Sequence, residues 1–272
     1  MVSFVVTGGN RGIGLEFVRQ LSANPDNVVF ATTRNKGRSH DLLALQTHHQ
    51  NLHILEADIT DVKALKAAAQ QVEKITGGTL DVLINNAALI PEDRVHYHLD
   101  DYANGQEELL EQDFITAFKI NTIGVAHTIN AFLPLLKNTS KTKTAKVITL
   151  SSGVADTDFT VKSEYGQATA YSVSKAATNM VVAKYAAEYK HENFVFLAIS
   201  PGYVKTKNET PPPEAQEFIK KMEGHFYKAY PDWNGKALTP TESVKLQLGV
   251  FEKLTPKDTG AFISQYGDKR WL

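Results

Sequence analysis

The sequence predicts a doubly wound α/β fold, in which helices cover both faces of a parallel sheet of about seven strands. Short apolar runs alternate with longer amphipathic runs along almost the whole chain, which is typical of repeated strand–helix–strand units. The apolar runs lack the strict alternation expected of strands with one solvated face, so both of their faces should be buried. No repeat and no linker interrupts this rhythm. We therefore expect residues 1–272 to form a single domain.

The elements can be assigned in order from the spacing of apolar residues. Helices are expected at 13–23, 41–49, 61–75, 107–136 and 171–190, because apolar residues recur there at helical spacing, as Phe17, Val18 and Leu21 do in the first. Two segments, at 89–105 and about 205–235, fit neither pattern and follow strands, so they should lie where such sheets bind ligands. We interpret the second as a lid over the substrate. Strands are expected at 2–8, 27–33, 51–58, 80–88, 145–152, 193–202 and 260–267.

The composition excludes several classes of function. With 29 basic and 30 acidic residues the net charge is −1, so the chain has no excess of cations for nucleic acid. It contains no cysteine, which excludes disulfides and thiolate metal sites, and its nine histidines form no plausible ligand set, so no metal is expected. It has neither an apolar run of membrane-spanning length nor a secretory signal. These features predict a soluble, cytoplasmic protein.

A glycine-rich turn, "TGGNRGIG", follows the first expected strand and opens the first helix. Gly8, Gly12 and Gly14 allow a tight turn and leave room where a Cβ would strike a pyrophosphate. The amino end of the following helix directs free N–H groups and a positive dipole toward that anion. A glycine cluster at this place in a βαβ unit predicts a dinucleotide site.

The residues after the second strand indicate which dinucleotide binds. An enzyme that uses NAD usually has an acidic residue there, whereas this strand runs into "TTRNKGR". Arg34, together with Arg11 in the glycine turn, can form charge-assisted hydrogen bonds with a 2′-phosphate. Lys36 and Arg38 are better interpreted as solvated surface charges. The residues thus predict NADP(H).

The stretch "YSVSK" places Tyr171 four residues before Lys175 on an expected helix, so both lie on one face. A free phenol has a pKa of about 10, and a neighbouring ammonium should lower that pKa toward the working range of an acid–base catalyst. Tyr203 and Lys207 repeat the spacing in an expected loop, and we interpret that pair as accidental.

Together, "TGGNRGIG", "NNAA", "LSS", "YSVSK" and "PGYVKT" resemble, in order and spacing, the short-chain dehydrogenase/reductase family, whose fold is a Rossmann-type sheet. "PGYVKT" and the ending "GAFISQYGDKRWL" resemble the Sniffer and C-factor branch of carbonyl reductases. The resemblance implies NADP(H)-dependent, reversible reduction of a ketone or aldehyde to an alcohol, with Tyr171 as the proton donor. Two alternatives stay open: another reaction on the same platform (imine or enone reduction, or epimerisation), and a non-catalytic NADP-binding regulator.

The same resemblance implies roles for individual residues. Ser152 should hydrogen-bond the substrate oxygen, with Ser151 as an open alternative, and Asn121 should support a water linked to Lys175. The gap between Ser152 and Tyr171 is longer than in the family, and we expect residues 157–169 to form a loop beside the substrate. Family members pair through their long helices in some cases, so a homodimer or homotetramer is possible. The catalytic residues implied are Asn121, Ser152, Tyr171 and Lys175, and the cofactor residues are Gly8, Asn10, Arg11, Gly12, Ile13, Gly14, Thr33, Arg34, Asp58, Ile59, Asn85, Ala87, Tyr171, Lys175, Pro201, Gly202, Val204 and Thr206.

Overall fold

The structure, a computed structural model, describes residues 1–103, 105–207 and 210–272. Seven parallel strands form one sheet in the order β3-β2-β1-β4-β5-β6-β7. The reversal of strand order between β1 and β4 is the point at which doubly wound sheets bind ligands. The predicted fold class is confirmed. The strands are β1 (Val2–Val6), β2 (Asn27–Thr33), β3 (Leu52–Glu56), β4 (Val82–Asn85), β5 (Ala145–Leu150), β6 (Phe194–Ser200) and β7 (Phe262–Ser264).

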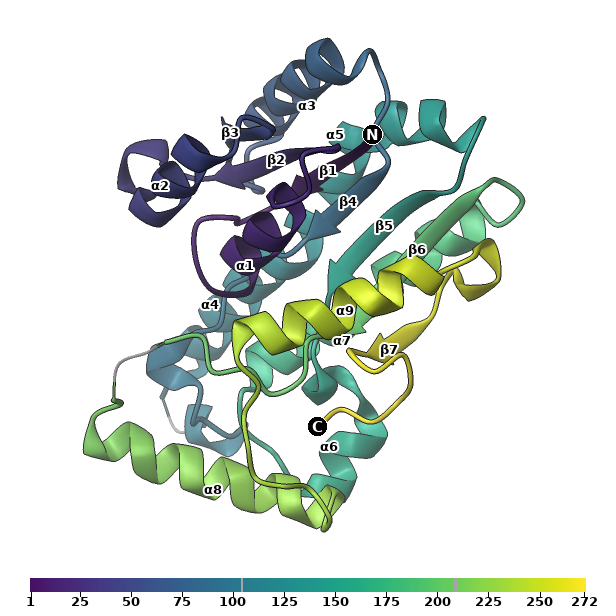
Figure 1. The fold of residues 1–272 in the computed structure, drawn as a ribbon. Helices are drawn as coiled ribbons and strands as arrows, with labels where there is room; N and C mark the ends of the chain where they lie inside the picture. The colour runs from purple at the N-terminus through teal and green to yellow at the C-terminus, as the bar shows by residue number, and fades with distance from the viewer. Residues whose placement is uncertain (104, 208–209) are drawn as a thin grey trace.

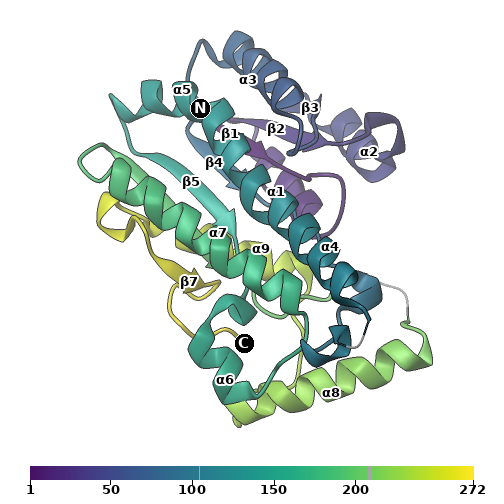
Figure 2. The same ribbon diagram turned by 180° about the vertical axis from the view of Figure 1, so that it is seen from behind.

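Helices cover both faces of the sheet. Figure 1 shows α1 and α9 in front of the sheet, and Figure 2, from behind, shows α3, α5 and α7 on the opposite face. Among the described residues, no helix is both long and apolar enough to cross a membrane, and no group of three or more metal-ligating side chains is present. The helices are α1 (Gly12–Ser22), α2 (His40–His48), α3 (Val62–Thr76), α4 (Glu107–Phe118), α5 (Gly124–Ser140), α6 (Thr157–Ser163), α7 (Thr169–Glu188), α8 (Pro213–Ala229) and α9 (Pro240–Lys253), with 3₁₀ turns at Lys36–Arg38, Glu92–Arg94, Asp100–Tyr102, Gly153–Ala155 and Pro256–Asp258.

The apolar core is divided by the sheet into two layers. Because side chains alternate along a strand, Val5 and Val6 contribute to different layers, and so do Leu83 and Ile84. One layer joins the sheet to α3, α5 and α7, and the other joins it to α1, α2 and α9. Burial on both faces explains why the strand segments show no alternation of apolar and polar residues.

Three segments differ from the sequence prediction. The helix expected at 107–136 is interrupted by a π-helical turn at Lys119–Ile123. Residues 157–169, expected as a loop, contain α6, because Asp156 caps it by accepting a hydrogen bond from the Phe159 N–H at 2.8 Å. Helices α8 and α9 were not predicted. A signal for α9 was present in the sequence, since Thr239 and Glu242 form a capping box around a proline at the first turn.

Candidate active site

The glycine turn between β1 and α1 has the conformation that its sequence predicts. Gly8 and Gly12 have φ angles of +66° and +55°, which side chains rarely adopt. A Cβ on Gly14 would lie 2.2 Å from the Gly8 carbonyl oxygen, so only glycine fits there. Arg11 is the N-cap of α1 and makes no side-chain cap, which leaves its guanidinium exposed beside the helix terminus. Asn10 and Ile13 of the same turn are half-buried.

Asn86 supports this turn and was not recognised from the sequence. Its side chain donates hydrogen bonds to the carbonyl oxygens of Thr7 (2.9 Å) and Gly8 (3.1 Å). In return, the Thr7 hydroxyl accepts from the backbone N–H groups of Asn86 and Ala87, each at 3.0 Å. These contacts join the end of β4 to the glycine turn, so Ala87 is held beside the turn. The second asparagine of "NNAA" was the signal available for this role.

The end of β2 lies alongside the glycine turn. The Gly9 N–H donates to the Thr32 carbonyl oxygen at 2.9 Å, and therefore the turn that carries Arg11 borders the strand end that carries Arg34. Arg34 is exposed, and the Thr33 hydroxyl is engaged with the Ser39 hydroxyl at 2.9 Å. This corner is consistent with two guanidinium groups accessible to one anion.

A carboxylate at this corner was missed. Glu56 at the end of β3 pairs in register with Thr33, and its side chain accepts a hydrogen bond from the Lys36 N–H at 2.9 Å. The acidic residue that the sequence analysis found absent from β2 is thus supplied by the neighbouring strand. Its side chain helps to hold the 3₁₀ turn that follows Arg34.

Asp58, Ile59 and Asn85 lie at the ends of β3 and β4. One carboxylate oxygen of Asp58 accepts from the N–H and the hydroxyl of Thr60, both at 2.8 Å. Ile59 is buried against α5, where a Cβ on Gly124 would lie 2.9 Å from it. Asn85 is buried and donates to the Thr149 hydroxyl at 3.1 Å, while its side-chain oxygen has no partner in the described part of the chain. An unpartnered buried oxygen marks a place for a donor that the protein itself does not supply.

Tyr171 and Lys175 lie on one face of the first turns of α7, as the spacing predicts. The Lys175 Nζ lies 5.8 Å from the centroid of the Tyr171 ring and donates to the Leu150 carbonyl oxygen at 2.8 Å. Ser152 forms a side-chain hydrogen bond with Tyr171, whereas the Ser151 hydroxyl contacts Asn179 Oδ1 at 2.6 Å. Of the two serines that the sequence left open, Ser152 is the one beside Tyr171.

The pKa of Tyr171 differs from the sequence expectation. Burial raises it to about 12, and the hydrogen bond with Ser152 offsets only part of this rise. Burial also lowers the pKa of Lys175 to about 8, since only 3% of that residue is exposed. Among the protein's own groups, loss of solvent therefore outweighs the attraction between phenolate and ammonium. At neutral pH Tyr171 is a neutral phenol that can donate a proton.

Asn121 lies in the π turn, a feature often found at functional sites. Its side chain donates to the Leu89 carbonyl oxygen and the Ser174 hydroxyl, both at 2.9 Å, and accepts from the Leu89 N–H at 2.7 Å. Asn121 therefore joins the segment after β4 to α7, next to Lys175. The water relay expected of it stays a prediction.

The segment after β6 faces the glycine turn. Pro201 is held by a hydrogen bond from Ser243 at 2.7 Å, and Gly202 has a φ angle of +84°. Val204 forms an isolated parallel bridge with Leu238. Thr206 is exposed, and its Cβ lies 3.5 Å from where a Cβ on Gly12 would stand. The two loops that were expected to contact opposite ends of a cofactor are therefore neighbours.

The aromatic residues of the expected lid pack inward. Of the residues expected at about 205–235, 208 and 209 lie outside the described residues. Phe226 of α8 packs against Phe159 of α6, with 5.9 Å between ring centroids, and against Tyr203 at 5.6 Å. The Tyr203 hydroxyl donates to Glu223 at 3.1 Å, so Tyr203 and Lys207 do not form a second Tyr–Lys pair of the α7 type. Helix α8 thus covers the carboxyl edge of the sheet together with α6 (Figure 1).

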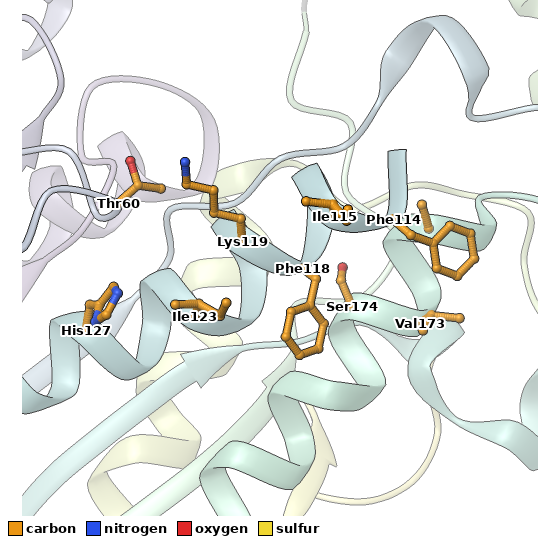
Figure 3. Close-up of a pocket in the computed structure, with 10 residues that line it drawn as sticks. Thr60, Phe114, Ile115, Phe118, Lys119, Ile123, His127, Val173 and Ser174 are labelled. Atoms are coloured by element: carbon orange, nitrogen blue, oxygen red, sulfur yellow. The ribbon is translucent and has the colours of Figure 1, made fainter. Parts of the chain in front are cut away.

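A cavity of about 490 Å³ lies elsewhere, along α4, the π turn, α5 and α7 (Figure 3). Its labelled apolar side chains include Phe118, Ile123 and Val173, all of which are exposed. Of the predicted site, the cavity contacts only Ser174, a neighbour of Lys175. It is therefore an apolar surface of the helical layer, separate from the Tyr171–Ser152 pair.

Comparison with known proteins gives a consistent result. The family model described as short chain dehydrogenase matches residues 3–217. The chain is 42% identical to the short-chain dehydrogenase/reductase AacuF of Aspergillus aculeatus and 40% identical to the short chain dehydrogenase virK of Hypocrea virens, covering 100% of each chain in both cases. Among solved structures it resembles an NADPH-bound carbonyl reductase from chicken fatty liver (TM-score 0.78, 32% identity, 99% and 98% of the chains covered) and the carbonyl reductase Sniffer of D. melanogaster (TM-score 0.79, 25% identity, 98% of each chain covered).

Proposed function

Because the chain belongs to the short-chain dehydrogenase/reductase family, we propose that it is an NADP(H)-dependent oxidoreductase that reversibly reduces the carbonyl of a ketone or aldehyde to an alcohol. One observation carries the proposal. Ser152 and Tyr171 are hydrogen-bonded to each other, with Lys175 on the same helix face, at the sheet edge that also holds the glycine turn. The names of the similar carbonyl reductases support the same assignment.

The residues present fit a dinucleotide. The space above Gly14 could not accommodate a side chain, and the adjacent terminus of α1 offers N–H groups to a pyrophosphate. Asn85 Oδ1 is buried without a partner, which suits a hydroxyl donor such as that of a ribose. Arg11 and Arg34 are free to approach a 2′-phosphate. Bound NADPH would supply the hydride. Asp58, Val204 and Thr206 are assigned to the two ends of the cofactor by the family resemblance.

The chain's own residues then act on the carbonyl oxygen. Tyr171, with a pKa of about 12, keeps its proton at neutral pH and can donate it to that oxygen as charge develops. Ser152 can hydrogen-bond the same oxygen and stabilise the charge. Lys175, protonated below its pKa of about 8, places a positive charge beside the phenol as the proton leaves. Asn121 fixes α7 relative to the segment after β4, so that Tyr171 and Lys175 keep their positions.

Loss of NADPH absorbance with a panel of ketones, aldehydes and quinones tests the proposal. We expect turnover with at least one class of carbonyl. Tyr171→Phe should lower kcat by about 10²- to 10⁴-fold, the usual contribution of a general acid, while NADPH affinity stays within about two-fold. Tyr185→Phe removes a hydroxyl bonded to Asn130 on the same helix and should change neither value. Full activity in Tyr171→Phe, or tight NADPH binding with no turnover of any carbonyl, would contradict the proposal.

We further propose that the protein acts in the cytoplasm as a homo-oligomer, with a second copy covering the apolar face seen in Figure 3. Exposed apolar residues are gathered there at helical spacing: Ile115 and Phe118 on α4, Val173 and Met180 on α7. Such a cluster on one face is unusual for a monomer. A two-fold contact needs only this one patch, because the same surface is used by both copies.

A further inference from the structure

Tyr165 lies in the segment between α6 and α7, six residues before Tyr171. Its N–H bonds the Thr160 carbonyl oxygen at 3.2 Å, directly after Glu164 has turned the chain with a φ angle of +54°. At the other end, the Ala168 N–H donates to the Val95 carbonyl oxygen at 2.9 Å. The backbone on both sides of Tyr165 is thus fixed by hydrogen bonds.

Helix α8 holds the same segment from outside (Figure 2). The Nδ1 atom of His225 contacts the Ser163 carbonyl oxygen at 3.0 Å, and Lys228 forms an ion pair with Glu164. The Tyr165 ring packs against the rings of His225 and Phe226, each with 5.9 Å between centroids. Only 4% of Tyr165 is exposed. This packing restricts the rotation of the ring.

The hydroxyl of Tyr165 makes no hydrogen bond to any other part of the chain that the structure describes, although buried tyrosines usually find a partner. It is also not among the fully enclosed polar atoms without a partner, so its small exposed area reaches open space. The neighbouring phenols are engaged, since Tyr203 donates to Glu223 and Tyr171 bonds Ser152. Tyr165 is the phenol of this group that remains available.

The electrostatics support a position beside the reacting carbonyl. Burial raises the pKa of Tyr165, and Tyr171 and Tyr203 contribute to the rise, which requires the three phenols to lie near one another. Tyr165 is therefore neutral at physiological pH and can either donate or accept a hydrogen bond. Phe226 packs against both Tyr165 and Tyr203, so the surroundings are aromatic.

We propose that Tyr165 is a specificity-determining residue whose hydroxyl hydrogen-bonds a second oxygen of the substrate, selecting aromatic carbonyl compounds that carry a hydroxyl or a further carbonyl in addition to the group reduced. This inference rests on the proposed reductase function. A site whose buried hydroxyl lacks a partner favours a ligand that supplies one over a ligand that does not. The fixed backbone and packed ring hold the hydroxyl at one distance from Tyr171, so one position of the second oxygen is preferred.

Acetophenone, its three monohydroxy isomers and the matching methyl ethers are suitable probes, because the ethers accept hydrogen bonds but do not donate them. In the wild-type protein, kcat/KM for one hydroxy isomer should exceed that for acetophenone. Tyr165→Phe should reduce this ratio by about three- to ten-fold and leave kcat/KM for acetophenone within about two-fold. Tyr185→Phe, which removes a hydroxyl far from the site, should leave the ratio unchanged.

Equilibrium binding of the same ketones, followed by tryptophan fluorescence, separates the two proposals. Trp233 packs 5.9 Å from the Tyr203 ring and should report occupancy. Absence of turnover with a binding preference that Tyr165→Phe abolishes would reject the reductase function and keep the recognition role. An isomer ratio unchanged in Tyr165→Phe, in both turnover and binding, would overturn the inference, and so would the absence of any preference in the wild-type protein.

Discussion

Lys175 lies over the ring of Tyr171, with its ammonium nitrogen 5.8 Å from the ring centroid and bonded to the Leu150 carbonyl oxygen. Burial of this pair moves the two pKa values toward the neutral forms, to about 12 for the phenol and about 8 for the ammonium. A charge kept in such a place costs folding free energy, because the protein returns less solvation than water provides. The arrangement is therefore expected to serve chemistry at some expense of stability.

Replacement of Lys175 by Met should make the protein more stable at pH 7 while it loses activity. The folded chain holds the Lys175 proton less tightly than the unfolded chain, so the free energy of unfolding should rise from about pH 8 to about pH 10.5. Lys175→Met removes this dependence and the cost of the buried charge, offset by the lost bond to Leu150. We expect a net gain of about 1–2 kcal/mol at pH 7.

Urea unfolding at pH 7 and pH 9.5 measures this effect, since Tyr171 does not titrate in that interval. Lys184→Met on the same helix is the control, because that side chain is only half-buried. A variant that is less stable at pH 7 and retains the wild-type pH dependence would show that Lys175 is not the group responsible.

Arg34→Asp should shift the cofactor preference from NADPH toward NADH. The substitution removes a charge-assisted hydrogen bond to the 2′-phosphate and adds repulsion, so the ratio of kcat/KM values for NADPH and NADH should fall by about ten-fold or more. Arg38→Asp, at an exposed position in the following 3₁₀ turn, is the matched control and should change the ratio much less. An equal effect of both substitutions would indicate general surface electrostatics in place of a specific contact.

Gly14→Ala should abolish NADPH binding and destabilise the fold. The added Cβ would lie 2.2 Å from the Gly8 carbonyl oxygen and 2.4 Å from Asn86 Nδ2, both of which hold the glycine turn. We expect a loss of stability of about 1–3 kcal/mol from this overpacking. Gly224→Ala on α8 meets no atom within 4 Å and should be neutral or slightly stabilising. Thermal melting with and without NADPH distinguishes the two, and an unchanged ligand-induced shift in Gly14→Ala would contradict the assigned phosphate site.

Phe118→Glu should dissociate the proposed homo-oligomer, because it places a charge at the centre of the apolar face. Val161→Glu alters an equally exposed apolar residue on α6, away from that face, and should leave the assembly intact. Light scattering coupled to size-exclusion chromatography gives the mass in each case. A wild-type mass of a single chain, or an assembly unaffected by Phe118→Glu, would exclude this face as the interface.

Local patterns were sufficient for the features that depend on neighbouring residues in the chain. The spacing of Tyr171 and Lys175 predicts a shared helix face, and the positive φ angles of Gly8 and Gly12 agree with the expected tight turn. Periodicity likewise identified the strands. It did not identify α8 and α9, in which capping and long-range packing matter more than a regular apolar stripe. The 157–169 segment was misinterpreted as a loop for the same reason, since α6 is stabilised by Asp156 and by aromatic contacts with α8.

The sequence by itself determined the fold class, the family resemblance and the position of the Tyr–Lys pair, because periodicity and spacing act over one strand or one helical turn. Only the tertiary structure decided that Ser152 bonds Tyr171 while Ser151 bonds Asn179, that Glu56 lies beside the end of β2, and that Tyr165 is packed against α8. It also reversed the expected direction of the Tyr171 pKa shift. The physical reason is that burial and partner choice depend on segments distant in the chain, and the cost of removing a charge from water is set by all of them together.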